Sequence, residues 1–117
     1  MPGTKKKKLL YNGYKDKAKR VCRYCGQSYA ERHEVFGGSN RQTSIRHGFQ
    51  VDVCGEHHRE LQENITEWAQ EENRNLRSGY QREYMDKLID SGVTERDALR
   101  TWMWLIGRNY IEELMPE

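Results

Sequence analysis

The chain has 117 residues, enough for one ordinary domain, but only 35% of them are apolar and 32% are charged. So small an apolar fraction predicts a thin core that needs a metal ion or a partner for its stability. No apolar run approaches the length of a membrane span or a signal-peptide core, so we expect a cytoplasmic protein with no membrane partner.

Residues 1–20 are predicted to form a flexible basic arm. Eight cations there stand against one acid, Asp16, for a local net charge of about +7, whereas the whole chain carries only +2. Such an arm is typical of an electrostatic tether to DNA phosphates, although a lysine-rich terminus can also be a solvated tail. Its candidate nucleic-acid-binding residues are Lys5, Lys6, Lys7, Lys8, Lys15, Lys17, Lys19 and Arg20.

Two short strands are predicted after a turn that contains two cysteines. Residues 21–28 hold a Cys-x-x-Cys-Gly motif, in which Gly26 can take the positive φ that a metal-binding knuckle needs. Residues 34–36 predict a first strand, which leads into the turn-rich segment 37–40. Residues 49–53 alternate apolar and polar side chains, as a half-buried strand does, and a polar loop is expected between the two strands.

Helical patterns occupy the second half of the chain. Apolar residues recur at helical spacing from residue 56 to about residue 75, and a weak break is expected at Ser78-Gly79. A second helix then extends to Ser91-Gly92, which is a typical C-terminal cap.

The last predicted helix begins at the capping box Thr94-x-x-Asp97, and its apolar stripe extends to Leu114. The chain therefore predicts an α+β fold. Residues 21–76 form its core, and residues 77–117 form a helical hairpin that packs on this core or on a partner.

Four soft ligands suit a single Zn²⁺ ion: Cys22, Cys25, Cys54 and His57. Positions three apart on a helix share a face, so Cys54 and His57 can bind the same ion as the Cys-x-x-Cys turn. The tetrahedral Cys₃His set resembles treble-clef sites, and the bound metal would contribute folding free energy directly. The alternatives are a redox Cys-x-x-Cys pair, for which the βαβ context is missing, and an ordinary buried Cys54.

His58 follows His57 directly, and adjacent residues on a helix point about 100° apart. We therefore expect His58 to face the groove between the helix and the strands, where His33 arrives from the first strand. Two converging histidines near a basic arm make a candidate site for a second metal ion that binds a phosphate. A structural role for His33 is the plainer interpretation.

The first half of the chain carries four motifs: Cys22-x-x-Cys25, Glu31-Arg32-His33-Glu34-Val35-Phe36-Gly37-Gly38-x-Asn40-Arg41, His47-Gly48-Phe49 and Cys54-x-x-His57-His58. Together they resemble the HNH (His-Me finger, ββα-metal) nucleases, and among these a group of small proteins encoded by bacteriophages and prophages. Residues 96–110 resemble the usual ending of that group, so the resemblance covers about residues 20–114. It implies a ββα-metal core followed by a helical tail.

The resemblance also implies a hairpin and a helix that hold one divalent ion, commonly Mg²⁺, Mn²⁺, Ni²⁺ or Zn²⁺, at the scissile phosphate. In such nucleases a strand histidine takes the proton from the attacking water, while the ion stabilises the leaving 3′ oxygen. By position, His58 is the helix ligand and Asn40 braces the loop. Arg41 joins the candidate nucleic-acid-binding residues.

The strand pair departs from the family pattern, because Glu34 stands where the second histidine usually is. In one register His33 is the ligand and Glu34 the base, although a carboxylate with a pKa near 4.3 is a weak base at neutral pH. In the other register His33 is the base and Arg32 occupies the ligand position, where arginine cannot bind a cation. Both registers stay open at this point.

Two functions follow as hypotheses. The first is a DNA endonuclease that hydrolyses phosphodiester bonds, with a structural zinc ion and a second ion at His33 and His58. The second is a catalytically weak or inactive zinc-binding protein of the same fold, which binds nucleic acid or inhibits a host defence complex in the manner of an anti-CRISPR protein. A homodimer through the C-terminal helices is compatible with either.

Overall fold

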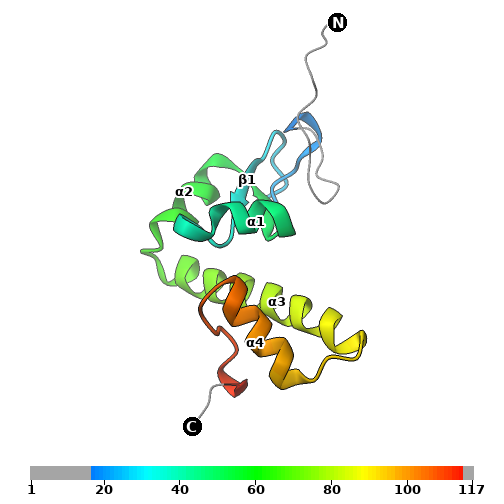
Figure 1. Ribbon diagram of the computed structural model, residues 1–117. Helices are drawn as coiled ribbons and strands as arrows, with labels where there is room; N and C mark the ends of the chain where they lie inside the picture. The colour runs from blue at the N-terminus through cyan, green and yellow to red at the C-terminus, as the bar shows by residue number, and fades with distance from the viewer. Residues whose placement is uncertain (1–16, 115–117) are drawn as a thin grey trace, which may run out of the picture.

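The computed structural model describes residues 17–114 and shows a small α+β protein (Figure 1). Its sheet has two antiparallel strands, β1 (Glu31–Glu34) and β2 (Gln50–Val53), in a register that pairs His33 with Val51. The α-helices are α1 (Arg41–His47), α2 (Gly55–Glu63), α3 (Glu67–Asp90) and α4 (Glu95–Leu105), and short 3₁₀ turns lie at Lys17–Lys19, Gly38–Asn40 and Glu112–Leu114. Lys5, Lys6, Lys7, Lys8 and Lys15 lie outside the described residues.

Strand β2 forms within the segment 49–53 that alternation predicts, but β1 and the segment between the strands differ from the prediction. Strand β1 starts three residues earlier than expected, and α1 replaces the expected polar loop. The helix is held by buried Ser44, whose hydroxyl donates to the Phe36 carbonyl at 2.7 Å and accepts from its N–H at 3.0 Å. Gly48, with φ of 77°, then turns the chain into β2. A polar segment can therefore be helical when one of its hydroxyls satisfies the neighbouring backbone.

The cysteine knuckle is tied to the sheet by backbone hydrogen bonds. Within it, the Gly26 N–H donates to the Cys22 carbonyl at 2.9 Å, and Gly26 has a φ of 76°, which confirms the positive value predicted for it. The Arg23 N–H donates to the carbonyl of Asp52 in β2 at 3.0 Å. The knuckle is therefore placed directly beside the strand that leads into α2.

The single helix predicted over residues 56–75 is two helices. Asn64 takes a left-handed φ of 54° and ends α2, and Thr66 begins α3 by accepting the Ala69 N–H at 3.1 Å. Helix α3 then passes through Ser78-Gly79, so the break predicted there is wrong, and the predicted domain boundary at residue 77 falls inside this helix. A single interior glycine costs only about 1 kcal/mol relative to alanine, which a helix of this length with a packed face can absorb.

Helix α4 begins as predicted and ends earlier. The Thr94 hydroxyl accepts the Asp97 N–H at 3.1 Å, which confirms this part of the capping box. The helix ends at Leu105 because Gly107 has a φ of 92° and turns the chain back. The helix was expected to continue with its apolar stripe to Leu114, and this part of the prediction is wrong. The residues after Leu105 form a loop that ends in the 3₁₀ turn Glu112–Leu114.

The helical tail packs on the strand region. Trp102 of α4 is fully buried, and its ring centroid lies 5.5 Å from that of Phe36, 5.7 Å from that of Phe49 and 5.6 Å from that of Tyr84. Figure 1 shows α3 and α4 side by side, below the layer that contains β1, α1 and α2. No helix within residues 17–114 combines the length and the apolar character that a membrane crossing requires.

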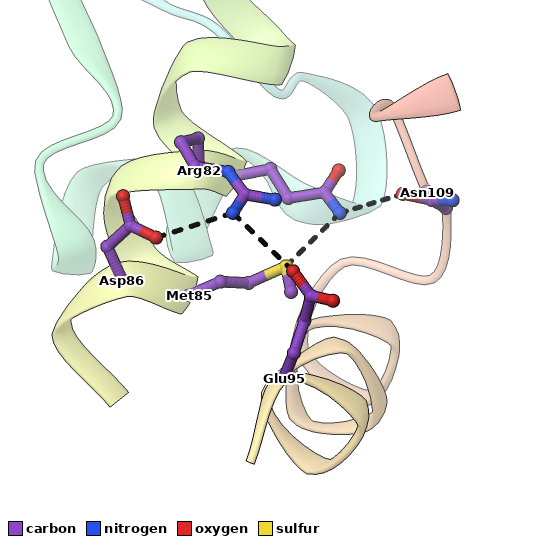
Figure 2. A network of polar contacts seen from close by, with 6 residues as sticks. Arg82, Met85, Asp86, Glu95 and Asn109 are labelled. Atoms are coloured by element: carbon purple, nitrogen blue, oxygen red, sulfur yellow. Dashed lines mark hydrogen bonds and ion pairs between the residues drawn. The ribbon is translucent and has the colours of Figure 1, made fainter. Parts of the chain in front are cut away.

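Polar contacts join α3 to the segment that follows α4 (Figure 2). The fully buried side chain of Gln81 donates to the Asn109 side-chain oxygen at 2.8 Å and accepts the Tyr110 N–H at 2.7 Å. Next to these two hydrogen bonds, the Arg82 Nη1 lies 3.9 Å from the Oε2 of Glu95 at the start of α4. The return of the chain after α4 is therefore held by satisfied buried hydrogen bonds, which give it one defined path.

Candidate metal centre

Cys22, Cys25, Cys54 and His57 come together in the structure as one ligand set. One ligand atom from each lies within 4.8 Å of every other, and all three cysteines are free of disulfide bonds. It is also the only such group of three or more metal-ligating side chains found in the described part of the chain. The structure thus contains a Cys₃His cluster that can bind a metal ion such as zinc.

The spacing within the cluster suits a tetrahedral ion. His57 Nδ1 lies 3.2 Å from Cys54 Sγ and 3.5 Å from Cys22 Sγ. Ligands that surround one zinc ion, at about 2.3 Å for sulfur and about 2.0 Å for nitrogen, are roughly 3.5 Å apart. The observed separations are those of side chains arranged around one shared centre.

The start of α2 positions half of this set. Cys54 is the N-cap residue, so its Sγ lies over the first turn and accepts the His57 N–H at 3.5 Å. The helix cap therefore holds the thiol and the imidazole on the same side of the turn. Tyr24 and Trp68 pack against the His57 ring at centroid distances of 5.3 and 5.4 Å, which fixes the orientation of this imidazole, whereas Cys25 of the same cluster is exposed.

The electrostatics favour a thiolate at Cys22. Burial raises the pKa of this thiol, but the backbone N–H groups of Cys54, Tyr24 and Cys25, together with His57, outweigh burial and lower the pKa to about 6. A thiolate is the form that binds metal, so the backbone of the knuckle prepares this ligand before an ion arrives.

His58 points away from this cluster, as the helical rotation predicts. Its Nδ1 lies 2.7 Å from Oε1 of Glu31, and its ring lies 5.2 Å from the ring of His33, edge to face. Gly55 leaves the space for this contact, because a Cβ there would lie 3.3 Å from Oε2 of Glu31. The structure thus brings together Glu31, His33 and His58 at the junction of β1 and α2.

His33 is the buried member of this second group. It is only 6% exposed, and its Nε2 has no hydrogen-bond partner among the described residues. Burial, followed by the charges of His58 and Arg77, lowers the pKa of His33 to about 4. The imidazole is therefore neutral at pH 7, with a buried nitrogen that lacks a partner within the protein.

Glu34 and Asn40 do not join this group. Adjacent residues of a strand face opposite sides, and the Glu34 carboxylate lies 3.6 Å from the Arg41 Nε and accepts the Gln50 amide at 3.3 Å. The Asn40 amide donates to the carbonyl of Ile106 at 3.0 Å. Asn40 thus connects the turn before α1 to the end of α4.

Glu31 is the site residue that the sequence interpretation missed. The signal was the alternation of a strand, which places Glu31 on the same face as His33 and therefore toward the helix that carries His58. Of the cations predicted to contact DNA, Lys17 and Lys19 are exposed on the 3₁₀ turn that precedes the knuckle.

Comparisons of the chain with protein-family models, with curated proteins and with solved structures found no match.

Proposed function

We propose that this protein is a metal-dependent DNA endonuclease of the HNH type, in which a zinc ion in the Cys₃His cluster is the scaffold. The observation that carries the proposal is the meeting of His33 and His58, one from a strand and one from a helix, at a ring separation of 5.2 Å. His58 directly follows His57, which belongs to the Cys₃His cluster. An ion bound in that cluster would therefore fix the orientation of α2, the helix that carries His58.

The chemistry of the first cluster favours zinc. Three cysteines and one histidine form a closed tetrahedral set, which is typical of structural zinc sites and leaves no open position for a substrate. Because few residues of the chain are apolar, its core supplies little stability by itself. A zinc ion in this cluster would stabilise the fold, since the free energy of metal binding adds to the folding free energy.

In this proposal Glu31 and His58 hold a divalent ion such as Mg²⁺, Mn²⁺ or Ni²⁺ as two protein ligands, and water and the phosphate fill its other positions. The Glu31 carboxylate and the His58 imidazole lie 2.7 Å apart, and the His33 ring lies 5.2 Å from the His58 ring. When bound, such an ion polarises the phosphate and stabilises the leaving oxygen. In this proposal His33, which is neutral at pH 7, accepts the proton of the attacking water, although a pKa of about 4 makes it as weak a base as an ordinary carboxylate.

Glu31 also resolves a difficulty of the register in which His33 is the base. That register leaves Arg32 in the ligand position, where it cannot bind a cation. The Glu31 carboxylate, 2.7 Å from His58, can take the ligand role instead. In this arrangement Glu34 has no part in catalysis, because its carboxylate is engaged with Arg41 and Gln50.

A second candidate function has an observation in its favour. The His33 side chain is buried and therefore nearly inaccessible to solvent. Glu34 also stands where the HNH pattern usually has a second histidine. Both features favour a zinc-stabilised binding protein that has lost cleavage and acts on nucleic acid or on a host defence complex.

A plasmid-nicking assay with Mg²⁺, Mn²⁺ or Ni²⁺ separates the two functions. The proposal expects nicking by the wild type and its loss in His33→Ala, His58→Ala and Glu31→Ala. Glu34→Ala is the matched control, a carboxylate removed from the opposite face of the same strand, and it should still nick. If no ion supports nicking while the protein retains one zinc per chain, the binding function is the correct one.

A further inference from the structure

A cavity of about 580 Å³ lies between the end of α1 and the C-terminal half of α3, and no residue of the Cys₃His cluster or of the Glu31–His33–His58 group lines it. Its lining includes Arg46 and His47 from α1 and Tyr84 and Lys87 from α3. The volume falls in the range of small-ligand sites, about 300 to 1,000 Å³.

The cavity presents flat aromatic surfaces. The His47 ring is stacked on the buried Phe49 ring, with centroids 5.5 Å apart and planes 16° apart, and Tyr84 meets His47 edge to face at 5.9 Å. His47 is itself exposed, so one face rests on Phe49 while the ring stays open to a ligand. Burial, followed by the charge of Arg46, lowers the pKa of His47, so a stacking partner meets a neutral ring at pH 7.

Two cations flank these rings. Arg46 and Lys87 are both exposed, and neither makes an ion pair with any of the described residues. One carboxylate, Glu83, also lines the cavity and can accept hydrogen bonds from an amino group. Aromatic faces beside unpaired cations are the combination that binds a base and the phosphate attached to it.

We propose that this cavity binds an unpaired nucleotide of a nucleic-acid strand, with the base stacked on His47 and the phosphates at Arg46 and Lys87. A base within a duplex is already stacked on both faces, so only a single-stranded or extruded nucleotide can use the cavity. This inference rests on the proposed function in taking nucleic acid as the ligand, and it names the substrate class as strands with unpaired nucleotides.

The test is fluorescence anisotropy with the full chain and no added Mg²⁺, Mn²⁺ or Ni²⁺. The probes are a labelled single strand of about 12 nucleotides, within the site sizes of single-strand-binding folds, and the blunt duplex of the same sequence. We expect His47→Ala to weaken binding of the single strand about fivefold or more, the lower end of base-stacking effects, and to leave duplex binding unchanged. Arg46→Ala and Lys87→Ala should each make the slope of log affinity against log salt concentration less steep for the single strand, by the contribution of about one phosphate contact.

The matched controls lie on α4. Trp104→Ala removes an exposed aromatic ring and Arg100→Ala an exposed cation, both outside this cavity, and both should bind the single strand as the wild type does. Equal binding by His47→Ala and the wild type, or a loss in Trp104→Ala instead, would overturn the inference.

The outcome is distinguishable from a failure of the endonuclease proposal. Binding that depends on His47 without any nicking would remove the enzyme and keep the cavity. Nicking that needs His33 and His58, together with single-strand binding that is unchanged in His47→Ala, would keep the enzyme and remove the cavity.

Discussion

Adjacent histidines at the start of α2 serve two different clusters. The Nδ1 of His57 lies 3.2 Å from Cys54 Sγ, whereas the Nδ1 of His58 lies 2.7 Å from Glu31. The rotation of about 100° between neighbouring helical residues accounts for this division. A single residue step thus separates a residue of the Cys₃His cluster from a residue of the candidate catalytic group.

The buried His33 predicts a pH dependence of stability. The ordinary pKa of 6.5 applies in the unfolded chain, whereas burial and nearby positive charge lower the folded pKa to about 4. Between these values the unfolded chain binds a proton at this residue that the folded protein does not bind. The unfolding free energy should therefore fall by roughly 3 kcal/mol as the pH drops from 6.5 to about 4.

Urea denaturation of the wild type and His33→Gln across this pH range measures that effect. Release of a metal ion from the Cys₃His cluster at low pH would affect both proteins equally, so the difference between the two curves isolates His33. We expect the wild type to lose more stability than His33→Gln as the pH falls. Parallel curves would show that His33 titrates normally in the folded protein.

Among the secondary-structure elements, those that could be predicted are the ones marked by alternating apolar residues or by a helix-capping residue. The strand at residues 50–53 and the start of α4 at Thr94 were both identified from such signals. Helix α1 was missed because its stability depends on the buried Ser44 hydroxyl, which bonds to Phe36 in a neighbouring segment. The division at Asn64 was missed because a left-handed asparagine inside an apolar periodicity leaves the spacing almost unchanged.

Two glycines of the α3–α4 hairpin should respond oppositely to alanine. Gly79 lies inside α3 and a Cβ there would have no atom within 4 Å, so Gly79→Ala should stabilise the protein by about 1 kcal/mol. Gly92 has a φ of 108° in equally open space, so Gly92→Ala should cost about 1 kcal/mol or more. Thermal unfolding of the zinc-loaded variants measures both, and a loss of stability in Gly79→Ala would contradict the continuous helix.

At the scale of the whole molecule, the helical tail completes the core. The Cys₃His cluster could be predicted from the spacing of its four residues, but the contact of α4 with Phe36 and Phe49 could not, because the apolar stripe of α4 suits either this core or a partner. The choice depends on how the chain returns after Gly107, where Asn109 and Tyr110 bond to Gln81. Dimer formation through these helices stays a prediction.

Two tryptophans of α4 test this packing as a matched pair. Trp102 is 0% exposed and Trp104 is 86% exposed. Trp102→Ala should destabilise the protein by about 3 to 5 kcal/mol, since a large buried side chain is lost, whereas Trp104→Ala should change stability by less than about 0.5 kcal/mol. Urea denaturation gives both values, and equal midpoints for the two variants would place the tail outside the core.

The central claim is that one zinc ion joins the cysteine knuckle to the first turn of α2 through His57 and not through His58. Metal content of the purified protein, determined by mass spectrometry under native conditions, tests it most directly. We expect one zinc per chain in the wild type and in His58→Ala, and a loss of that zinc in His57→Ala. A wild type that folds without zinc, or a His58→Ala variant that loses it, would contradict the account.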